Sequence, residues 1–158
     1  MSRVAPSMQR VDFYLLSGTE ERSRFKLGCR IAEQGYLVGQ RVFVWLAEQR
    51  SLERFDELLW TFADRSFVPH EIYTQAEQWQ DTPVLLSCDG CPDQPFELLV
   101  NLGSTIPAAA AHAGRIAELI DADEDRRRAG RSRFRQYRDR GVTPETHTLA
   151  AEDSPLTP

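Results

Sequence analysis

The sequence lacks the features that define several large protein classes. Three cysteines in 158 residues are too few for the disulfide scaffold of a small secreted domain. The apolar runs fall far short of the roughly 20 residues that a membrane-spanning helix needs. No basic segment followed by an apolar run opens the chain, so the sequence predicts no secretory signal. These absences, together with 41% apolar residues, predict a soluble cytoplasmic protein of one domain.

The motifs of nucleotide binding and catalysis are also missing. The loop after the first predicted strand, residues 17–21, reads Ser-Gly-Thr-Glu-Glu and contains no glycine-rich phosphate-binding pattern. Its two acids would repel a phosphate. The three histidines are isolated from any nucleophile-and-acid constellation that the sequence reveals. We therefore predict no catalytic residue, no metal site and no cofactor.

Cys88 and Cys91 have the C-x-x-C spacing of redox dithiols and of half a zinc site. Pro92 and Pro95 follow them, so no helix is expected to begin there and lower a thiol pKa. The remaining cysteine and histidines lack paired ligand spacing. The favoured interpretation is an ordinary loop between two strands, and a thiol or metal enzyme is the least favoured hypothesis.

Short apolar runs alternate with amphipathic segments along the chain. Residues 11–16, 41–46, 83–86 and 96–102 have the composition of strands buried on both faces, and helices are expected to end near residues 37 and 62. This alternation predicts an α/β fold, a single Rossmann-like domain with a mostly parallel central sheet flanked by helices. The domain is expected over residues 11–142, after a flexible leader (1–10) and before a disordered tail (143–158). The pattern alone does not decide between helix and strand for residues 115–120.

Charge is distributed unevenly along the chain. The chain has a net charge of −5, but residues 126–140 hold eight arginines and one acid, for +7. The remaining residues, 11 basic and 23 acidic, therefore carry −12. One concentrated basic element on an acidic body can capture an anionic partner, although the body would repel nucleic acid.

The basic element is predicted to be a long helix near the C-terminal end, over residues 121–140. At 100° per residue, four arginines fall within a sector of about 80°. These are Arg127, Arg131, Arg135 and Arg138. The adjoining sector of about 60° holds Gly130, Phe134, Tyr137 and Gly141. Guanidinium groups beside aromatic rings and missing side chains suit an acidic peptide that carries an aromatic residue. Two alternatives stay open: ordinary core packing under a solvated face, and direct binding of nucleic acid.

A second unusual feature combines Trp60 with Phe67, Val68 and Pro69. Apolar residues beside a proline stand here in a segment that should be an exposed connection. The sequence supports equally an ordinary core position and a patch on which a partner docks.

Three segments together resemble one family, the chi subunit of bacterial DNA polymerase III. They are Val11-Asp12-Phe13-Tyr14-Leu15-Leu16; Leu59-Trp60 followed by Ser66-Phe67-Val68-Pro69-His70; and Arg131-x-Arg133-Phe134-Arg135-x-Tyr137-Arg138-x-x-Gly141. The resemblance runs in order from about residue 11 to residue 142. It implies a Rossmann-like accessory subunit of DNA replication that has no active site of its own, and it favours a strand at residues 115–120.

The resemblance also implies partners and site residues. The family couples the clamp loader to single-stranded DNA-binding protein by holding that protein's acidic C-terminal tail, which ends in Pro-Phe. The matching positions here are Arg127, Arg131, Phe134 and Arg135. The resemblance implies that Arg131 binds the terminal carboxylate of the tail and that Phe134 forms a wall of the pocket for its phenylalanine. Phe134 stands where the family usually has a tyrosine. Tyr137 and Arg138 of the same stripe complete the predicted tail site. The family's interface for the psi subunit matches Trp60, Phe67, Val68 and Pro69, a surface that could bind a helicase instead. DNA is thus expected to be contacted only indirectly.

Overall fold

The computed structural model describes residues 9–65 and 67–149. Seven strands form one parallel sheet in the order β3-β4-β2-β5-β6-β1-β7. The elements along the chain are β1 (Arg10–Leu16), α1 (Glu21–Leu37), β2 (Val42–Leu46), α2 (Gln49–Thr61), β3 (His70–Ile72), η2 (Ala76–Gln80), β4 (Val84–Ser87), β5 (Phe96–Leu102), η3 (Ala108–His112), β6 (Ala113–Ile120), α3 (Glu124–Asp139) and β7 (Glu145–Leu149). The predicted α/β fold with a parallel central sheet is confirmed.

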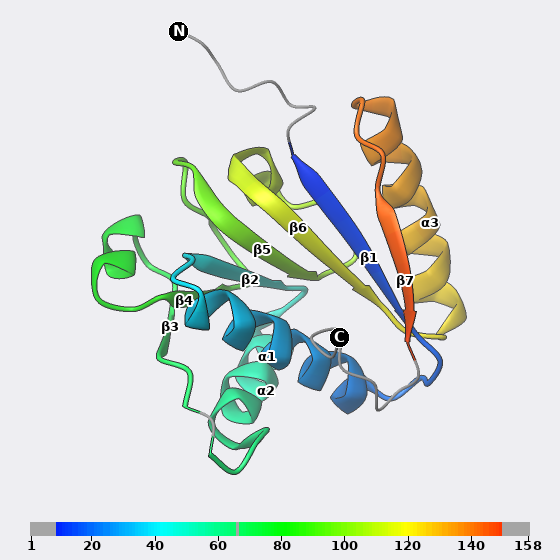
Figure 1. Cartoon of the computed structure of the whole chain (residues 1–158). Coiled ribbons are helices and arrows are strands. Elements are labelled where there is room, and N and C mark those ends of the chain that lie inside the picture. Colours follow the sequence, from blue (N-terminus) through cyan, green and yellow to red (C-terminus); the bar gives the residue numbers. More distant parts are fainter. Residues whose placement is uncertain (1–8, 66, 150–158) are drawn as a thin grey trace, which may run out of the picture.

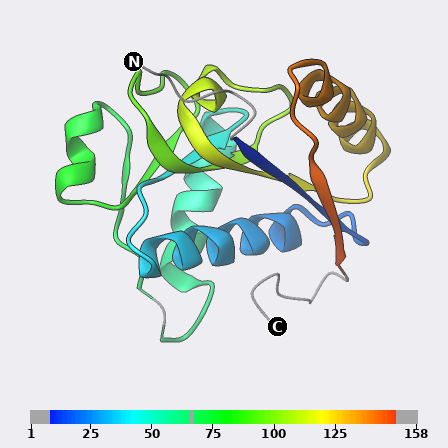
Figure 2. The same ribbon diagram turned by 45° about the horizontal axis from the view of Figure 1, so that its top comes forward.

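Helices cover both faces of the sheet. Figure 2 shows α1 and α2 on one face and α3 on the other. The core correspondingly splits into two clusters, one beneath α1 and α2 and one that includes Tyr137 of α3 and residues of the two 3₁₀ turns. Because the central strands are buried on both sides, they read as continuous apolar runs in the sequence. Among the described residues, no helix is long and apolar enough to cross a membrane.

The prediction of a disordered tail from residue 143 is wrong for residues 145–149. These residues form β7, which pairs in parallel with β1 along the edge of the sheet (Figure 1). Threonine and histidine at exposed or half-exposed positions give β7 no apolar pattern, so periodicity could not identify it. Residues 1–8 of the predicted leader and 150–158 of the predicted tail lie outside the described residues, and Arg10 already belongs to β1.

Buried and half-buried polar groups hold β7 against the sheet. Asp12 of β1 is fully buried, and its carboxylate lies 2.9 Å from Nε2 of His147 on β7. The His147 ring stacks on Tyr14, with ring centroids 4.9 Å apart. The same carboxylate accepts a 3.0 Å bond from Nε of Arg115 on β6. Asp12 therefore ties three neighbouring strands together through its side chain.

This carboxylate should make the stability of the protein depend on pH. Burial raises the pKa of Asp12, but the hydrogen bonds from His147 and Arg115, together with the charges of Arg115 and Arg10, outweigh burial and bring its pKa below the usual value. A lowered pKa stabilises the fold above the pKa of the unfolded chain, about 3.9, and this contribution disappears as the pH falls through the folded value. We therefore expect the wild type to have a higher free energy of unfolding than the Asp12→Asn variant at neutral pH. In acid, the difference between the two proteins should disappear. Urea titrations between pH 3 and pH 7 measure this, and a pH-independent difference would contradict it.

Candidate functional site: an arginine-lined groove beside the last helix

The N-terminus of α3 is fixed by two aspartates in the turn after β6. Asp121 is buried and receives two 2.8 Å bonds from the guanidinium of Arg126, which raise the pKa of that arginine. Asp123 caps the helix by accepting a 3.0 Å bond from the backbone N–H of Arg126. The predicted helix over 121–140 is thus observed from Glu124 to Asp139, with the first acids serving as the turn and the cap.

A buried polar network fixes the rotation of α3 about its own axis. Glu118 of β6 is fully buried and accepts bonds from Nε of Arg133 at 2.9 Å and from the Tyr137 hydroxyl at 2.7 Å. The Asn101 amide of β5 donates to the same carboxylate at 3.0 and 3.1 Å. Burial, followed by the charge of Glu118, raises the pKa of Tyr137 far above its usual range. With Arg133 and Tyr137 held inward, the neighbouring arginines of α3 are left on the surface.

Gly130 allows α3 to approach the sheet closely. A Cβ at this position would overlap the Cδ1 atom of Ile120 on β6. We expect Gly130→Ala to destabilise the protein by about 1–3 kcal/mol through overpacking, a cost larger than the gain in helix propensity. The free energy of unfolding in denaturant checks this. Adding Ile120→Val, which removes the overlapping methyl group, should recover part of the loss, and no recovery would contradict the packing argument.

A groove of about 410 Å³ lies between α3 and the sheet edge formed by β1, β6 and β7. Its apolar surface comes from strands and helix alike, and Phe13 and Phe134 pack across it with ring centroids 5.2 Å apart. Three exposed arginines of α3 border it. The lining residues are Phe13, Leu15, Ile120, Arg127, Gly130, Arg131, Phe134, Arg135 and Thr146.

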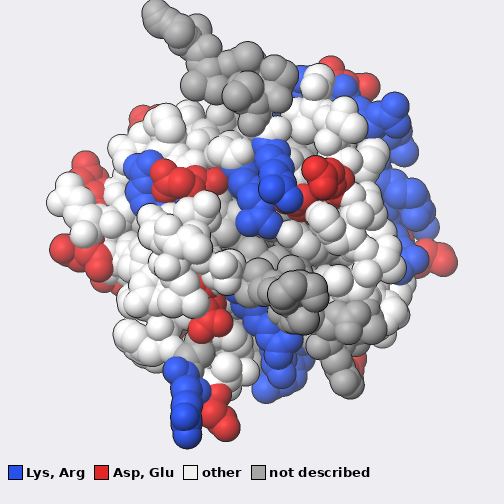
Figure 3. All heavy atoms as spheres, viewed as in Figure 1, with Lys and Arg blue, Asp and Glu red and all other residues white. Residues whose placement is uncertain are grey.

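The charges at this groove are available to a ligand. Arg131 and Arg135 are exposed and make no ion pair with any described residue, whereas Arg127 donates only to the backbone oxygen of Asp121, at 3.3 Å. Basic side chains gather along the side of the molecule at which Figure 1 places α3 (Figure 3). An apolar groove bordered by unpaired guanidinium groups can hold a carboxylate and an aromatic ring at the same time.

The structure brings together four of the six residues predicted for the tail site: Arg127, Arg131, Phe134 and Arg135. Tyr137 is a correction, since it is buried beneath the helix with its hydroxyl bound to Glu118 and cannot contact a ligand in the groove. Arg138 is exposed but does not line the groove.

Sequence reasoning missed the sheet side of the groove. Phe13 and Leu15 alternate on β1, and this alternation could have placed them on one face of the sheet. Nothing in the sequence indicated Thr146, because β7 itself was unexpected.

The second predicted surface is partly exposed. Trp60 at the end of α2 and Phe67 are 54% and 60% exposed, and their ring centroids lie 5.7 Å apart. Val68 is a correction, because its side chain is buried in the core beneath α1 and α2. His70 is buried under Trp60 and makes a 2.7 Å hydrogen bond to the backbone oxygen of Val68. The exposed ring of Trp60 on α2 and that of Phe67 in the loop that follows form a small apolar patch.

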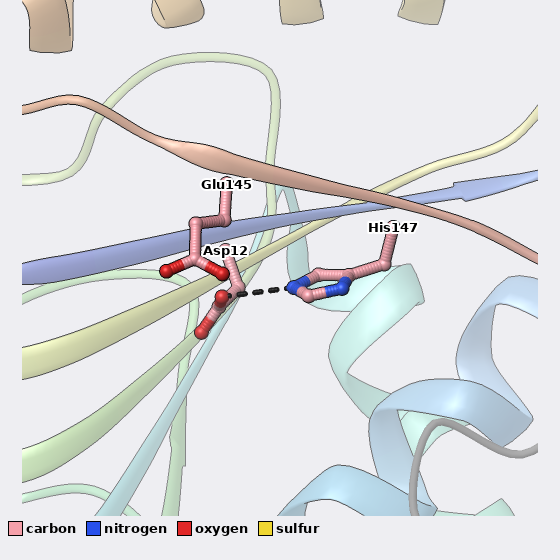
Figure 4. A group of neighbouring side chains, drawn as sticks. All are labelled: Asp12, Glu145 and His147. Atoms are coloured by element: carbon pink, nitrogen blue, oxygen red, sulfur yellow. Dashed lines mark hydrogen bonds and ion pairs between the residues drawn. The ribbon is translucent and has the colours of Figure 1, made fainter.

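Two further clusters carry atoms that could ligate a metal or react as thiols. Ligand atoms of Asp12, Glu145 and His147 lie within 4.8 Å of one another (Figure 4), but Arg10 and Arg115 already neutralise the Asp12 carboxylate and would repel a cation. Cys88 and Cys91 are free thiols in the loop between β4 and β5, and burial raises the pKa of Cys91. A raised pKa disfavours the reactive thiolate that a redox dithiol needs.

The fold and the groove define an α/β protein with a basic groove, lined by apolar side chains, at one edge of a parallel sheet. A profile of the family described as "DNA polymerase III chi subunit, HolC" matches residues 8–145. The chain belongs to this family of DNA replication subunits.

Curated relatives support this assignment, and one solved structure shares the fold. The chain is 32% identical over 142 residues to the DNA polymerase III subunit chi of Pseudomonas aeruginosa, covering 90% of this chain and 98% of that protein. The chi subunit of Haemophilus influenzae is 27% identical over 138 residues, covering 87% and 95%. The crystal structure of T4 UvsW superposes with a TM-score of 0.65 at 11% identity, over 92% of this chain and 42% of that chain, and shows a shared fold only.

Proposed function

We propose that this chi-family protein is a replication adaptor that binds the acidic C-terminal tail of single-stranded DNA-binding protein in the groove beside α3. The observation that carries the proposal is the combination of exposed, unpaired arginines with an apolar floor between α3 and the sheet. A tail ending in Pro-Phe presents acidic side chains, a terminal carboxylate and one aromatic ring, which are the chemical counterparts of this surface.

The groove suggests a role for each residue. Arg131 lies beside both Gly130 and Phe134, so its guanidinium is the proposed partner of the terminal carboxylate. Phe134 and Phe13, which pack against each other, would form one apolar surface for the terminal ring. Arg127 and Arg135 would attract the acidic residues that precede it. In this function the protein would need no active site and no cofactor of its own.

The test is fluorescence-polarisation binding of a labelled acidic peptide that ends in Asp-Ile-Pro-Phe. The same peptide without its final phenylalanine serves as the control. We expect saturable binding of the first peptide, weakening as salt is raised, and loss of binding for the second. Equal binding of both peptides would mean that the groove does not recognise the final phenylalanine and attracts the peptides only as a nonspecific cationic surface. If neither peptide bound, the proposal would be refuted.

Direct binding of nucleic acid is the second candidate, favoured by the concentration of arginines on α3. It requires affinity for single-stranded DNA without any partner protein and a steep decline of that affinity with salt. A gel-shift titration at low salt distinguishes the two functions. The acidic remainder of the chain makes this candidate the weaker one.

The exposed rings of Trp60 and Phe67 are the proposed docking surface for the clamp-loader side, either the psi subunit or an equivalent partner, with a helicase as a further candidate. Phe67→Ala should weaken that association at least tenfold, because exposed aromatic rings are frequent interaction hot spots. It should leave the melting temperature and the tail affinity unchanged. Pull-down with each candidate partner, paired with tail-peptide binding, measures both. As a replisome adaptor the protein would act in the bacterial cytoplasm, at the nucleoid.

A further inference from the structure

A second cavity, of about 480 Å³, lies at the carboxyl ends of β2, β5 and β6. Glu48 follows β2 at one wall, Gly103 and Ser104 follow β5 at the floor, and Ile120 ends β6. From β2 the chain continues through α2 toward β3 and β4, whereas from β5 it continues toward β6. The connections therefore diverge between β2 and β5, which is the position at which open parallel sheets most often bind ligands.

Three helices begin at this cavity. Glu21 and Arg24 belong to the first turn of α1, Ser51 to the first turn of α2, and Asp125 to the first turn of α3. Helix N-termini present free backbone N–H groups and a partial positive charge. Neither α1 nor α2 has a side-chain hydrogen bond at its N-cap. The cavity thus collects the electropositive ends of all three α-helices of the described chain.

Arg24 lines this cavity as a buried cation that forms no ion pair with any described residue. The residue is only 7% exposed, and its Nη1 makes long contacts of 3.3 and 3.5 Å to the backbone oxygens of Leu102 and Leu119. Its Nε–H is buried and has no acceptor among the described residues. Burial, followed by the charge of Arg126, lowers the pKa of Arg24 to about 10. A desolvated guanidinium with an unused donor is costly unless a ligand completes it.

Most of the other charges around the cavity already have partners among the described residues. Arg126 is bound by Asp121 and Arg133 by Glu118. Of the acids at the rim, Glu21 pairs with Arg54 at 3.0 Å and Asp125 with Arg128 at 2.9 Å, while Asp123 caps α3. Glu48, the N-cap residue of α2, is the lining carboxylate without a partner among the described residues. Acids at the helix starts offset part of the helix dipoles, and, apart from the capping Asp123, Arg24 and Glu48 are the two lining charges that form no ion pair with any described residue.

We propose that this cavity binds a small oxyanion of the phosphate type, either free or as the phosphate group of a mononucleotide, with Arg24 as its charged partner. The guanidinium of Arg24 and the helix N–H groups would donate to it, and the Ser51 and Ser104 side chains lie at the same cavity. No glycine-rich loop wraps the site. Glu21, one of the two acids expected to repel a phosphate after the first strand, lies at this cavity but is paired with Arg54. Binding therefore depends on the guanidinium of Arg24. This inference is independent of the proposed tail binding, which uses the opposite side of α3.

The test measures the melting temperature of the full chain at increasing concentrations of inorganic phosphate. Chloride solutions of the same ionic strength serve as the control. At 100 times its Kd, phosphate should raise the melting temperature by roughly 5–10 °C. Arg24→Met should abolish that rise. Without phosphate, this variant should melt at or above the wild-type temperature, because it removes a buried charge that has no ion pair. Loss of the phosphate-induced rise in melting temperature would then not reflect misfolding. Arg138→Met, which removes an exposed arginine that neither lines the cavity nor pairs with any described residue, should respond as the wild type does.

A parallel titration with adenosine monophosphate distinguishes the two sources of the phosphate group. Tighter binding than inorganic phosphate identifies a nucleotide site, and equal binding identifies a site for the free anion. A wild-type melting temperature that does not respond to phosphate or to adenosine monophosphate would overturn the proposal. So would an Arg24→Met variant that responds as strongly as the wild type.

Discussion

Replacement of Arg131 by alanine is expected to weaken binding of the acidic tail peptide by about 1.5–3 kcal/mol, between roughly tenfold and 150-fold in Kd. Arg131 is exposed, lies at the groove beside Phe134, and makes no ion pair with any described residue. Its guanidinium therefore has no internal bond to give up when a carboxylate arrives. The change should leave the free energy of unfolding within about 0.5 kcal/mol of the wild type, as for most surface substitutions.

Two other arginines of α3 provide matched controls. Arg128 is exposed and already paired with Asp125 at 2.9 Å, and Arg138 is exposed and unpaired within the described chain, yet neither lines the groove. Arg128→Ala and Arg138→Ala remove the same charge from the same helix. We expect each to weaken binding less than threefold, through the general field alone. If all three variants lose affinity equally, binding depends on net charge and the assignment of Arg131 is wrong.

Arg131→Lys separates charge from geometry. Lysine keeps the positive charge but cannot donate the two parallel bonds with which a guanidinium grips a carboxylate. An affinity between those of the wild type and Arg131→Ala is expected by fluorescence polarisation. Full retention of affinity would indicate that the carboxylate is not held bidentately at this position.

Helical geometry is sufficient to predict one wall of the groove from the sequence. A spacing of three and four residues places Arg127, Arg131 and Arg135 beside Phe134, and the structure brings all four together. Their arrangement follows from α3 alone, so a local rule locates them. Tyr137 occupies the same stripe by spacing, but Glu118 draws it inward, and a partner 19 residues away along the chain is invisible to helical periodicity.

The opposite wall could not be predicted because it depends on pairing between distant strands. β7 is polar, lies at the sheet edge and packs through His147 onto Asp12, some 135 residues earlier in the chain. A strand whose residues are mostly exposed carries no hydrophobic alternation, so its register and even its existence are tertiary properties. The same holds for the cavity beside Arg24, whose lining comes from three helix starts and three strand ends.

Replacement of Arg133 by methionine is expected to lower the free energy of unfolding by about 3–5 kcal/mol, the largest effect predicted for a single substitution here. Glu118 is fully buried, and Arg133 is its buried cationic partner at 2.9 Å. Without that arginine the carboxylate keeps only the neutral donors Tyr137 and Asn101. Denaturant unfolding measures the loss. Arg135→Met, at an exposed position of the same helix, is the control and should change the free energy by no more than about 0.5 kcal/mol.

The double variant Glu118→Met/Arg133→Met separates two contributions of the buried ion pair: its contribution to the stability of the fold and its contribution to the orientation of α3. A well-packed apolar pair can replace a buried ion pair at little or no cost, so most of the stability lost in Arg133→Met should return. Tail affinity should not return with it, because directional bonds to Glu118 set the rotation of α3 that holds Arg131 and Phe134 at the groove. Unfolding and peptide binding measured on the same protein test both statements. Recovery of affinity together with stability would show that apolar packing alone orients α3, and that the buried pair contributes nothing specific to the binding surface.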